Sequence, residues 1–139
     1  MDIIRECMET VIQKLPTDLG LTEACYQRCL HHYLSKYGSV QQEVQLAYVF
    51  EDDGGKICTG AGRMDLVWRP HRKVEGCAKI WILELKVQPK VYKLSSFFPQ
   101  VRRYCYFYKK QFGPCEGVTI VFSPFCSQAH HTVKSSEGV

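Results

Sequence analysis

Three stretches of the chain carry apolar residues at spacings of three and four, which is the period of an amphipathic helix. They cover residues 2–15, 21–37 and 95–112. Pro16 should end the first helix and Gly38 the second, because proline cannot continue a helix and glycine commonly caps one. We therefore expect two helices near the N-terminus and a third near the C-terminal end.

Four other stretches have the character of strands. Residues 44–50 alternate, and residues 57–68 follow them after a strong turn signal at 52–55, with a bulge expected near the glycines of the second strand. Residues 79–87 are almost continuously apolar, as a central strand buried on both faces should be, and residues 118–122 have the same character. We expect three consecutive strands and a fourth after the third helix.

The order of helix, helix, three strands, helix and strand predicts an α/β sandwich around a central mixed sheet. A chain of 139 residues can bury a real core, and we expect one domain over residues 1–126. Residues 127–139 are polar, so we expect a flexible tail there.

Composition and the N-terminus bear on location. Hydrophobic residues make up 45% of the chain and charged residues 23%, which is an ordinary globular composition. No apolar run approaches the roughly 18 residues that span a bilayer, and charged residues interrupt the N-terminal segment where a secretory signal would need an apolar stretch. We therefore expect an intracellular protein, of cytoplasm or nucleus, that is neither secreted nor bound to a membrane.

Eight cysteines are many for such a chain. Without a secretory signal, reduced thiols packed as small apolar groups are the expected state. A structural zinc site is the weaker alternative, because no Cys-x-x-Cys occurs and the pairs His31-His32 and His130-His131 lack usual ligand spacing.

The net charge of +4 only weakly suggests a polyanionic partner. The distribution says more, because a run of basic residues has no acidic residue between its members. Such a run can be a solvated helix face, and it is also what a phosphate-facing surface looks like. Its members are Lys86, Lys90, Lys93, Arg102, Arg103, Lys109 and Lys110.

The residues that could carry out chemistry include two charged residues of the most apolar predicted strand, residues 79–87. Glu84 and Lys86 lie two apart there, so their side chains point to the same side. A salt bridge is the ordinary interpretation of such a pair. Asp65 favours a different one, because a hairpin of the two strands would bring Asp65 beside Glu84. Two convergent carboxylates form a natural site for a hard cation, with Lys86 able to stabilise charge on a phosphate.

These residues resemble the PD-(D/E)XK nuclease superfamily, whose signature is an Asp on one strand and Glu-x-Lys on the next. Asp65 and the segment 84–86 match it. The closer resemblance is to the small GxxExxY branch, through residues 20–26, residues 62–67, and the Gln100 and Tyr104 pair. The resemblance covers roughly residues 5–124 and implies a restriction-endonuclease-like fold, with a central mixed sheet flanked by helices.

The resemblance also implies a mechanism. Lys86 would orient and activate the water nucleophile, and Gln100 would position Lys86 or a phosphate oxygen. The reaction would hydrolyse a phosphodiester and leave a 5′-phosphate. The cofactor would be Mg²⁺, with Mn²⁺ as a substitute, and its ligands would be Asp65, Glu84, the Leu85 carbonyl and Glu23.

The expected partner is DNA, and the residues expected to contact it are Arg63, Lys90, Lys93, Arg102 and Arg103. Arg63 could equally pair with Asp65 or Glu43, and Glu23 taken alone is an ordinary solvated helix residue. A homodimer through exposed aromatic residues is a further expectation, and no haem or nucleotide cofactor is expected.

A magnesium-dependent deoxyribonuclease is thus the leading hypothesis, with endonuclease and exonuclease action both open. The first alternative is a catalytically silent nucleic-acid-binding or assembly module that keeps the nuclease fold, since fold alone never proves function. The second is metal-dependent hydrolysis of another phosphate ester.

Overall fold

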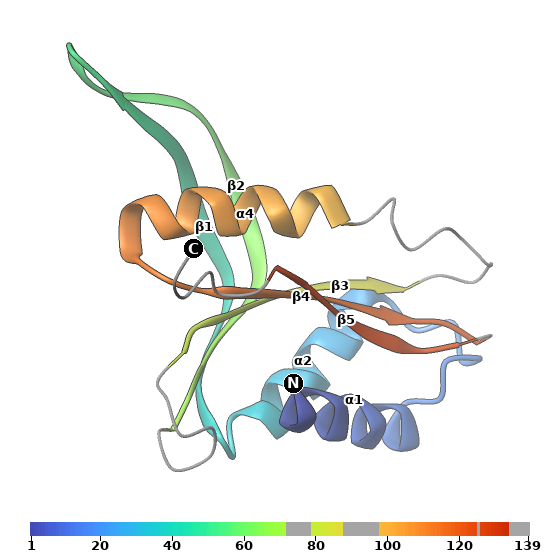
Figure 1. The fold of residues 1–139 in the computed structure, drawn as a ribbon. Coiled ribbons are helices and arrows are strands. Elements are labelled where there is room, and N and C mark those ends of the chain that lie inside the picture. The colour runs from blue at the N-terminus through green and yellow to red at the C-terminus, as the bar shows by residue number, and fades with distance from the viewer. Residues whose placement is uncertain (72–78, 88–97, 125, 134–139) are drawn as a thin grey trace.

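A computed structural model describes residues 1–71, 79–87, 98–124 and 126–133 of the chain. A five-stranded sheet lies at its centre, with helices on both faces (Figure 1). The elements are α1 (Asp2–Lys14), α2 (Glu23–Leu34), β1 (Gly38–Asp52), β2 (Gly55–Pro70), β3 (Trp81–Val87), α4 (Phe98–Phe112), β4 (Glu116–Phe122) and β5 (Gln128–Val133).

The strands are arranged in the order β1-β2-β3-β4-β5, which makes β3 the central strand. β1, β2 and β3 form an antiparallel meander, β3 and β4 are parallel, and β5 returns antiparallel to β4. A parallel pair needs a crossover connection, and α4 lies in the one between β3 and β4. The predicted α/β architecture with a central mixed sheet is confirmed.

The core is divided into two clusters by the sheet. α1 and α2 cover one face, where Leu30 of α2 packs with Leu83 and Leu85 of β3 (Figure 1). α4 covers the other face, where Val101 packs with Ile82 of β3. Since β3 contributes to both clusters, both of its faces need apolar residues, and this explains its nearly unbroken apolar sequence.

The second helix is shorter than predicted, since it ends at Leu34 and Gly38 does not cap it. Gly38 instead begins β1 and pairs with Pro70. A side chain there would collide with the backbone of Arg69 and Pro70. This glycine is therefore required by the close approach of two strands and not by the end of a helix.

The prediction of a flexible tail over residues 127–139 is wrong for Gln128–Val133, which form β5 on the edge of the sheet. Ala129 is buried against the core while its neighbours are only partly covered. The strand was missed because an edge strand with one covered side needs few apolar residues. Residues 134–139 lie outside the described part of the chain.

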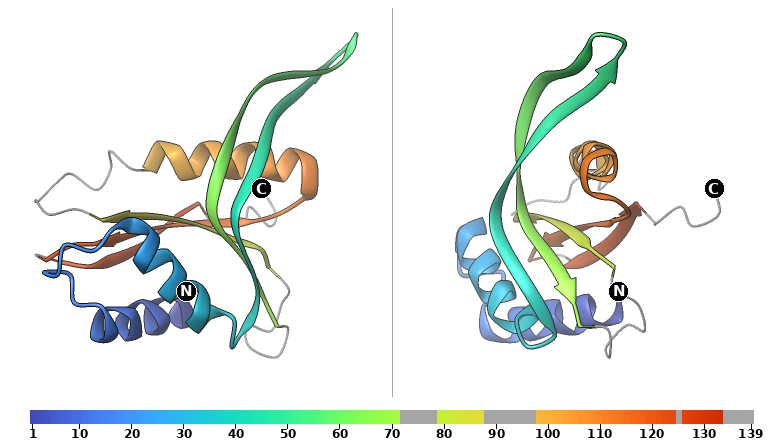
Figure 2. Two further views of the ribbon diagram at one scale, coloured as in Figure 1. Left: turned by 180° about the vertical axis from the view of Figure 1, so that it is seen from behind. Right: turned by 90° about the vertical axis from the view of Figure 1, so that its left-hand side faces the viewer.

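β1 and β2 extend well beyond the rest of the sheet. β2 pairs with β3 only through Leu66, Val67 and Trp68, whereas its pairing with β1 runs on to the turn at Gly55. The outer part, residues 49–58, projects as a two-stranded arm (Figure 2). The predicted irregularity lies at the base of this arm, where the register shifts between Tyr48 and Val49.

The cysteines of the described ranges are free thiols, and Cys77 lies outside those ranges. Three of them are buried, as expected for thiols that pack as apolar groups: Cys7, Cys105 and Cys115. The others depart from this expectation, since Cys25 and Cys29 are half-buried and Cys58 and Cys126 are exposed. None of the helices within the described residues combines the length and apolar character needed to cross a membrane.

Candidate active site

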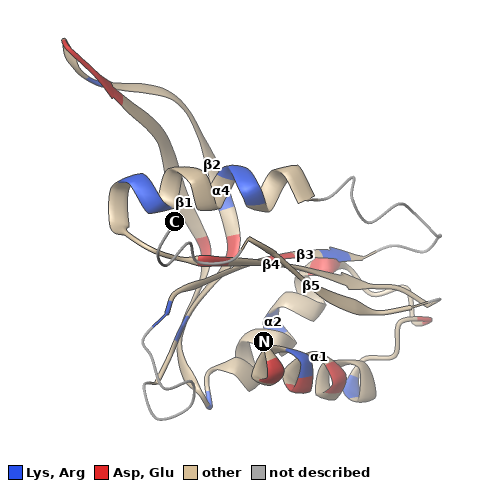
Figure 3. Cartoon of the chain, viewed as in Figure 1, with Lys and Arg blue, Asp and Glu red and all other residues tan. Residues whose placement is uncertain are grey.

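A hollow of about 510 Å³ lies where α2 and α4 approach the inner strands. All five residues predicted to be catalytic line it, and Arg63 lines it with them. Figure 3 shows an acidic position of β1 close to an acidic position of β2 where these strands pass α4, apart from the acidic positions at the end of the arm. The predicted residues are Glu23 from α2, Asp65 from β2, Glu84 and Lys86 from β3, and Gln100 from α4.

Asp65 and Glu84 are cross-strand neighbours at the end of the β2–β3 pairing, which stops at Leu66 and Leu83. The backbone N–H of Asp65 donates to Glu84 Oε1 at 3.1 Å. In return, the N–H of Leu85 donates to Asp65 Oδ2 at 2.8 Å. Each carboxylate thus uses one oxygen to hold the other strand, which fixes both side chains at the hollow.

Burial makes ionisation of this pair unfavourable. Glu84 is only 1% exposed. Desolvation and the negative charge of Asp65 raise the pKa of Glu84 to about 8, although Lys86 opposes the shift. Desolvation also raises the pKa of Asp65, against the opposing effects of the Leu85 N–H and Lys86. Without a bound cation, the pair therefore retains a proton near neutral pH.

Glu23 and Lys86 complete the charged part of the hollow. Glu23 is the first residue of α2 and lies at the exposed rim. Partial desolvation raises the pKa of Glu23, with Lys86 lowering it and Asp65 adding to the rise. Lys86 is half-buried on the same side of β3 as Glu84. The charges of Glu23, Lys86 and Asp65 therefore interact with one another across the same hollow.

Gln100 enters the hollow from the first turn of α4. Its Nε2 donates to the hydroxyl of Tyr104 at 3.2 Å. Tyr104 is 5% exposed and lines the same hollow one helical turn later. This contact fixes the orientation of the Gln100 amide.

The donor set suits a hard divalent cation, because carboxylate oxygens are the ligands that Mg²⁺ prefers. A cation held by Asp65 and Glu84 would compete with protonation, which the raised pKa of Glu84 favours. Within the described ranges, no group of three or more His, Cys, Asp or Glu side chains is already gathered in the geometry of a metal site. The carboxylate pair thus supplies the right chemistry, and α2 contributes a further acid, Glu23, at the rim of the same hollow.

The basic residues predicted to contact nucleic acid divide into two groups. Arg63 lies in the hollow, and its Nε donates to Glu43 Oε2 at 2.8 Å, so its partner is Glu43. Arg102 instead lines a separate depression between α4 and β5, and Arg103 is exposed on α4. Lys90 and Lys93 lie outside the described residues. The structure therefore brings Arg63 to the carboxylates and leaves Arg102 apart from them.

Two polar residues of the hollow were missed by sequence reasoning. Glu43 of β1, which the sequence suggested only as a possible partner of Arg63, lies on the strand next to Asp65, between the pairs Gln42–Leu66 and Val44–Met64, and its charge contributes to the raised pKa of Asp65. Gln27 lies one helical turn after Glu23, a spacing that puts both on one face of α2 and could have signalled its place.

A glycine beside the hollow provides a stability test. A Cβ at Gly62 would lie 2.6 Å from Tyr104 Cε1 and would collide with the Tyr48 hydroxyl. Gly62→Ala should therefore destabilise the protein by about 1–3 kcal/mol in urea denaturation, as overpacking usually does. Gly60→Ala is the matched control on the same strand, because its Cβ would meet only Tyr48 Cδ2 at 3.5 Å. Equal losses in the two variants would contradict this packing.

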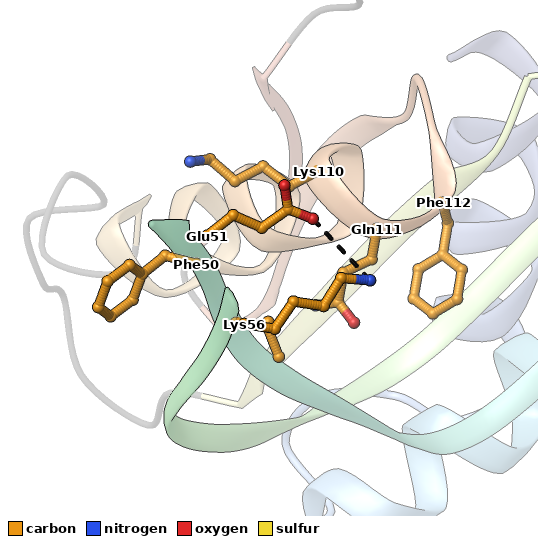
Figure 4. Close-up of a pocket in the computed structure, with 7 residues that line it drawn as sticks. Phe50, Glu51, Lys56, Lys110, Gln111 and Phe112 are labelled. Atoms are coloured by element: carbon orange, nitrogen blue, oxygen red, sulfur yellow. Dashed lines mark ion pairs between the residues drawn. The ribbon is translucent and has the colours of Figure 1, made fainter. Parts of the chain in front are cut away.

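A second hollow, of about 440 Å³, lies between the arm and the C-terminal end of α4 (Figure 4). Its walls include the exposed side chains of Phe50 and Phe112, together with a Lys56–Glu51 ion pair of 3.9 Å. Among the described residues that line it, Glu51 is the one acid. The described residues there form no carboxylate pair, so the first hollow is the candidate active site.

Comparisons with known proteins bear on the family and the fold of this chain. A comparison with curated proteins gives no match. Among solved structures, the chain is similar to the crystal structure of a protein named SSO0001, with a TM-score of 0.56 and 14% identity. That match covers 93% of this chain and 58% of the other, so the chain spans less than two thirds of that protein, and the likeness shows the fold alone. A family model described as the PD-(D/E)XK nuclease superfamily matches residues 1–115. The chain, with its restriction-endonuclease-like mixed sheet, therefore belongs to the PD-(D/E)XK nuclease superfamily.

Proposed function

We propose that this protein is a metal-dependent nuclease that hydrolyses DNA phosphodiester bonds at the hollow between α2, β2, β3 and α4. Membership of a nuclease superfamily supports phosphodiester hydrolysis in general. The observation that carries the proposal is the interlocked pair of Asp65 and Glu84, with Lys86 and Glu23 at the same hollow. The product would carry a 5′-phosphate, and membership of the GxxExxY branch stays a prediction.

The carboxylates would hold the cofactor. Members of this superfamily generally use divalent metals, and we propose Mg²⁺, with Mn²⁺ as a substitute. When bound, such a cation supplies Lewis-acid polarisation of the phosphoryl group. Its ligands would be Asp65, Glu84, the Leu85 carbonyl and Glu23.

Lys86 and Gln100 would act on the reacting groups. Lys86 projects beside Glu84 and would orient the attacking water while its positive charge stabilises the charge that develops on the phosphate. Gln100, oriented by Tyr104, would position Lys86 or a phosphate oxygen. Positioning of this kind lowers the barrier because the reacting atoms meet in one geometry.

A cleavage assay tests the proposal. The substrates would be single-stranded, duplex, flap and four-way-junction DNA and an RNA of matched sequence, each with Mg²⁺, Mn²⁺ or EDTA. We expect cleavage of DNA that requires the metal and falls by at least about 10²-fold in Asp65→Asn. Asp53→Asn is the matched control, because Asp53 lies in the exposed turn of the arm and should not affect the rate.

Each other outcome selects a different function. Equal rates in wild type and Asp65→Asn would point to a contaminating nuclease. Tight DNA binding without cleavage of any substrate would favour a catalytically silent module. Hydrolysis of a small phosphodiester without cleavage of any polymer would favour another phosphate ester as the substrate.

A further inference from the structure

We propose that Glu43 and Gln27 are positioning residues that hold Arg63 in place to contact a backbone phosphate of the nucleic acid beside the scissile one. This inference rests on the proposed function, which supplies the polymer substrate. It assigns a role to three polar residues that the hydrolytic site itself does not use.

Glu43 has an unusual backbone. With a φ of 55°, it is the only non-glycine residue in the described part of the chain that has a positive φ. β1 and β2 pair at Gln42 with Leu66 and at Val44 with Met64 in one continuous register, and Glu43 between them is not among the paired residues. A left-handed backbone is unfavourable for a residue with a Cβ, so surrounding contacts must hold it. The irregularity accompanies the placement of the Glu43 side chain in the hollow.

Gln27 supplies the first of these contacts. It is only 6% exposed on α2, and a buried amide needs hydrogen-bond partners. Its Nε2 donates to Glu43 Oε1 at 3.1 Å and lies 3.4 Å from Gln42 Oε1. Gln42 is in turn hydrogen-bonded to His31 Nδ1 at 2.6 Å. α2 is thereby joined to β1 at the point where the strand is distorted.

Arg63 supplies the second contact, through the 2.8 Å ion pair from its Nε to Glu43 Oε2. Both carboxylate oxygens of Glu43 are therefore engaged, one by Gln27 and one by Arg63. The ion pair uses only Nε, and the guanidinium has two terminal amino groups that can donate in parallel to two oxygens of a phosphate. The Arg63 side chain is 63% exposed, so a polymer can reach it.

Stability alone does not account for this arrangement. An exposed ion pair contributes little to folding, whereas the left-handed backbone of Glu43 opposes it. The carboxylate of Glu43 also adds negative charge beside Asp65, which Arg63 offsets. An arginine fixed in direction at the rim of the hollow is what the arrangement provides.

The test compares steady-state cleavage by Arg63→Ala, Glu43→Gln, Gln27→Ala and the Arg63→Ala/Glu43→Gln double variant. We expect KM to rise roughly tenfold in Arg63→Ala with kcat within about twofold, because a contact made equally before and during reaction changes KM alone. Glu43→Gln and Gln27→Ala should show a smaller rise. The double variant should be no worse than Arg63→Ala, since Glu43 acts through Arg63.

The matched control is another ion pair of the same two strands, that of Glu51 with Lys56 (Figure 4). Glu51→Gln and Lys56→Ala should leave KM unchanged. An unchanged or lower KM in Glu43→Gln would overturn the positioning role. Additive effects in the double variant would do so as well, because they would mean that Glu43 acts independently of Arg63.

A binding measurement separates this inference from the proposed function. In a Lys86→Ala background, the affinity for DNA is measured across salt concentrations, and Arg63→Ala should reduce the slope of log K against log salt by about 0.9, the value for one duplex phosphate. If the wild-type protein binds DNA with this salt dependence but cleaves none of the substrates, the proposed nuclease function is contradicted and the Arg63 contact is still supported. An unchanged slope would exclude the contact, whether or not the protein cleaves.

Discussion

Lys86→Ala is expected to slow phosphodiester cleavage by at least about 10²-fold without unfolding the protein. The variant removes a positive charge that lies at the hollow with Glu84 and that lowers the pKa values of Glu23, Asp65 and Glu84. It therefore loses both the group that we propose orients the attacking water and the charge that favours ionised carboxylates. Single-turnover rates at saturating Mg²⁺ measure the effect.

Lys79→Ala is the matched control for this variant. Lys79 lies two residues before β3, but its ammonium is 3.8 Å from Glu116 Oε1, and it does not line the hollow. The control should cleave like the wild type. A Lys86→Ala protein with wild-type rate and a wild-type melting temperature would remove Lys86 from the mechanism.

Glu84→Gln is expected to stabilise the metal-free protein at alkaline pH. The pKa of Glu84 is raised from 4.5 to about 8 in the folded state, so folded protein binds a proton that unfolded protein has released between these values. Stability therefore falls as pH rises through this window, by roughly 1.4 kcal/mol per pH unit at most and by a few kcal/mol in all. Glutamine keeps the acceptor for the Asp65 N–H and removes the penalty.

Urea denaturation in EDTA at pH values from 5 to 9 measures this difference. The two proteins should be similar at pH 5 and diverge towards pH 9, with the variant more stable. Glu51→Gln, an exposed position in the arm, should follow the wild type throughout. Parallel stability curves for wild type and Glu84→Gln would show that Glu84 ionises normally.

Mg²⁺ should offset this loss of folding stability of the wild type at alkaline pH. Because protons and the proposed cation would compete for Asp65 and Glu84, added Mg²⁺ should raise the melting temperature more at pH 8 than at pH 5. The same addition should have little effect on Glu84→Gln. This readout does not depend on finding the substrate.

The sequence was most informative where one local pattern had one structural meaning. Residues 79–87 read as a central strand because an apolar run of that length must be covered on both sides. Glu84 and Lys86 then had to share a side, and a hairpin had to bring Asp65 near them. These inferences needed only strand periodicity and a short connection.

Other features depended on contacts that no local pattern reveals. Glu43 reaches the hollow through a left-handed backbone, which sequence cannot signal at a residue other than glycine or asparagine. β5 has one buried residue, Ala129, and otherwise pairs with β4 through polar and half-buried residues, so its sequence resembled a tail. The basic run suggested one surface, but Arg102 lies apart from the hollow and Arg63, outside the run, lies in it.

The place where β2 parts from β3 has a consequence for mutagenesis. Beyond Leu66 and Leu83 no backbone partner continues the ladder, and the side-chain oxygens of Glu84 and Asp65 accept the next two backbone N–H groups instead. The two acids thus hold β2 and β3 together at the point where their backbone pairing ends. Alanine at either position would remove one of these hydrogen bonds along with the charge, whereas Asn at position 65 or Gln at position 84 would keep the accepting oxygen. Only the amide variants therefore separate loss of chemistry from loss of the fold.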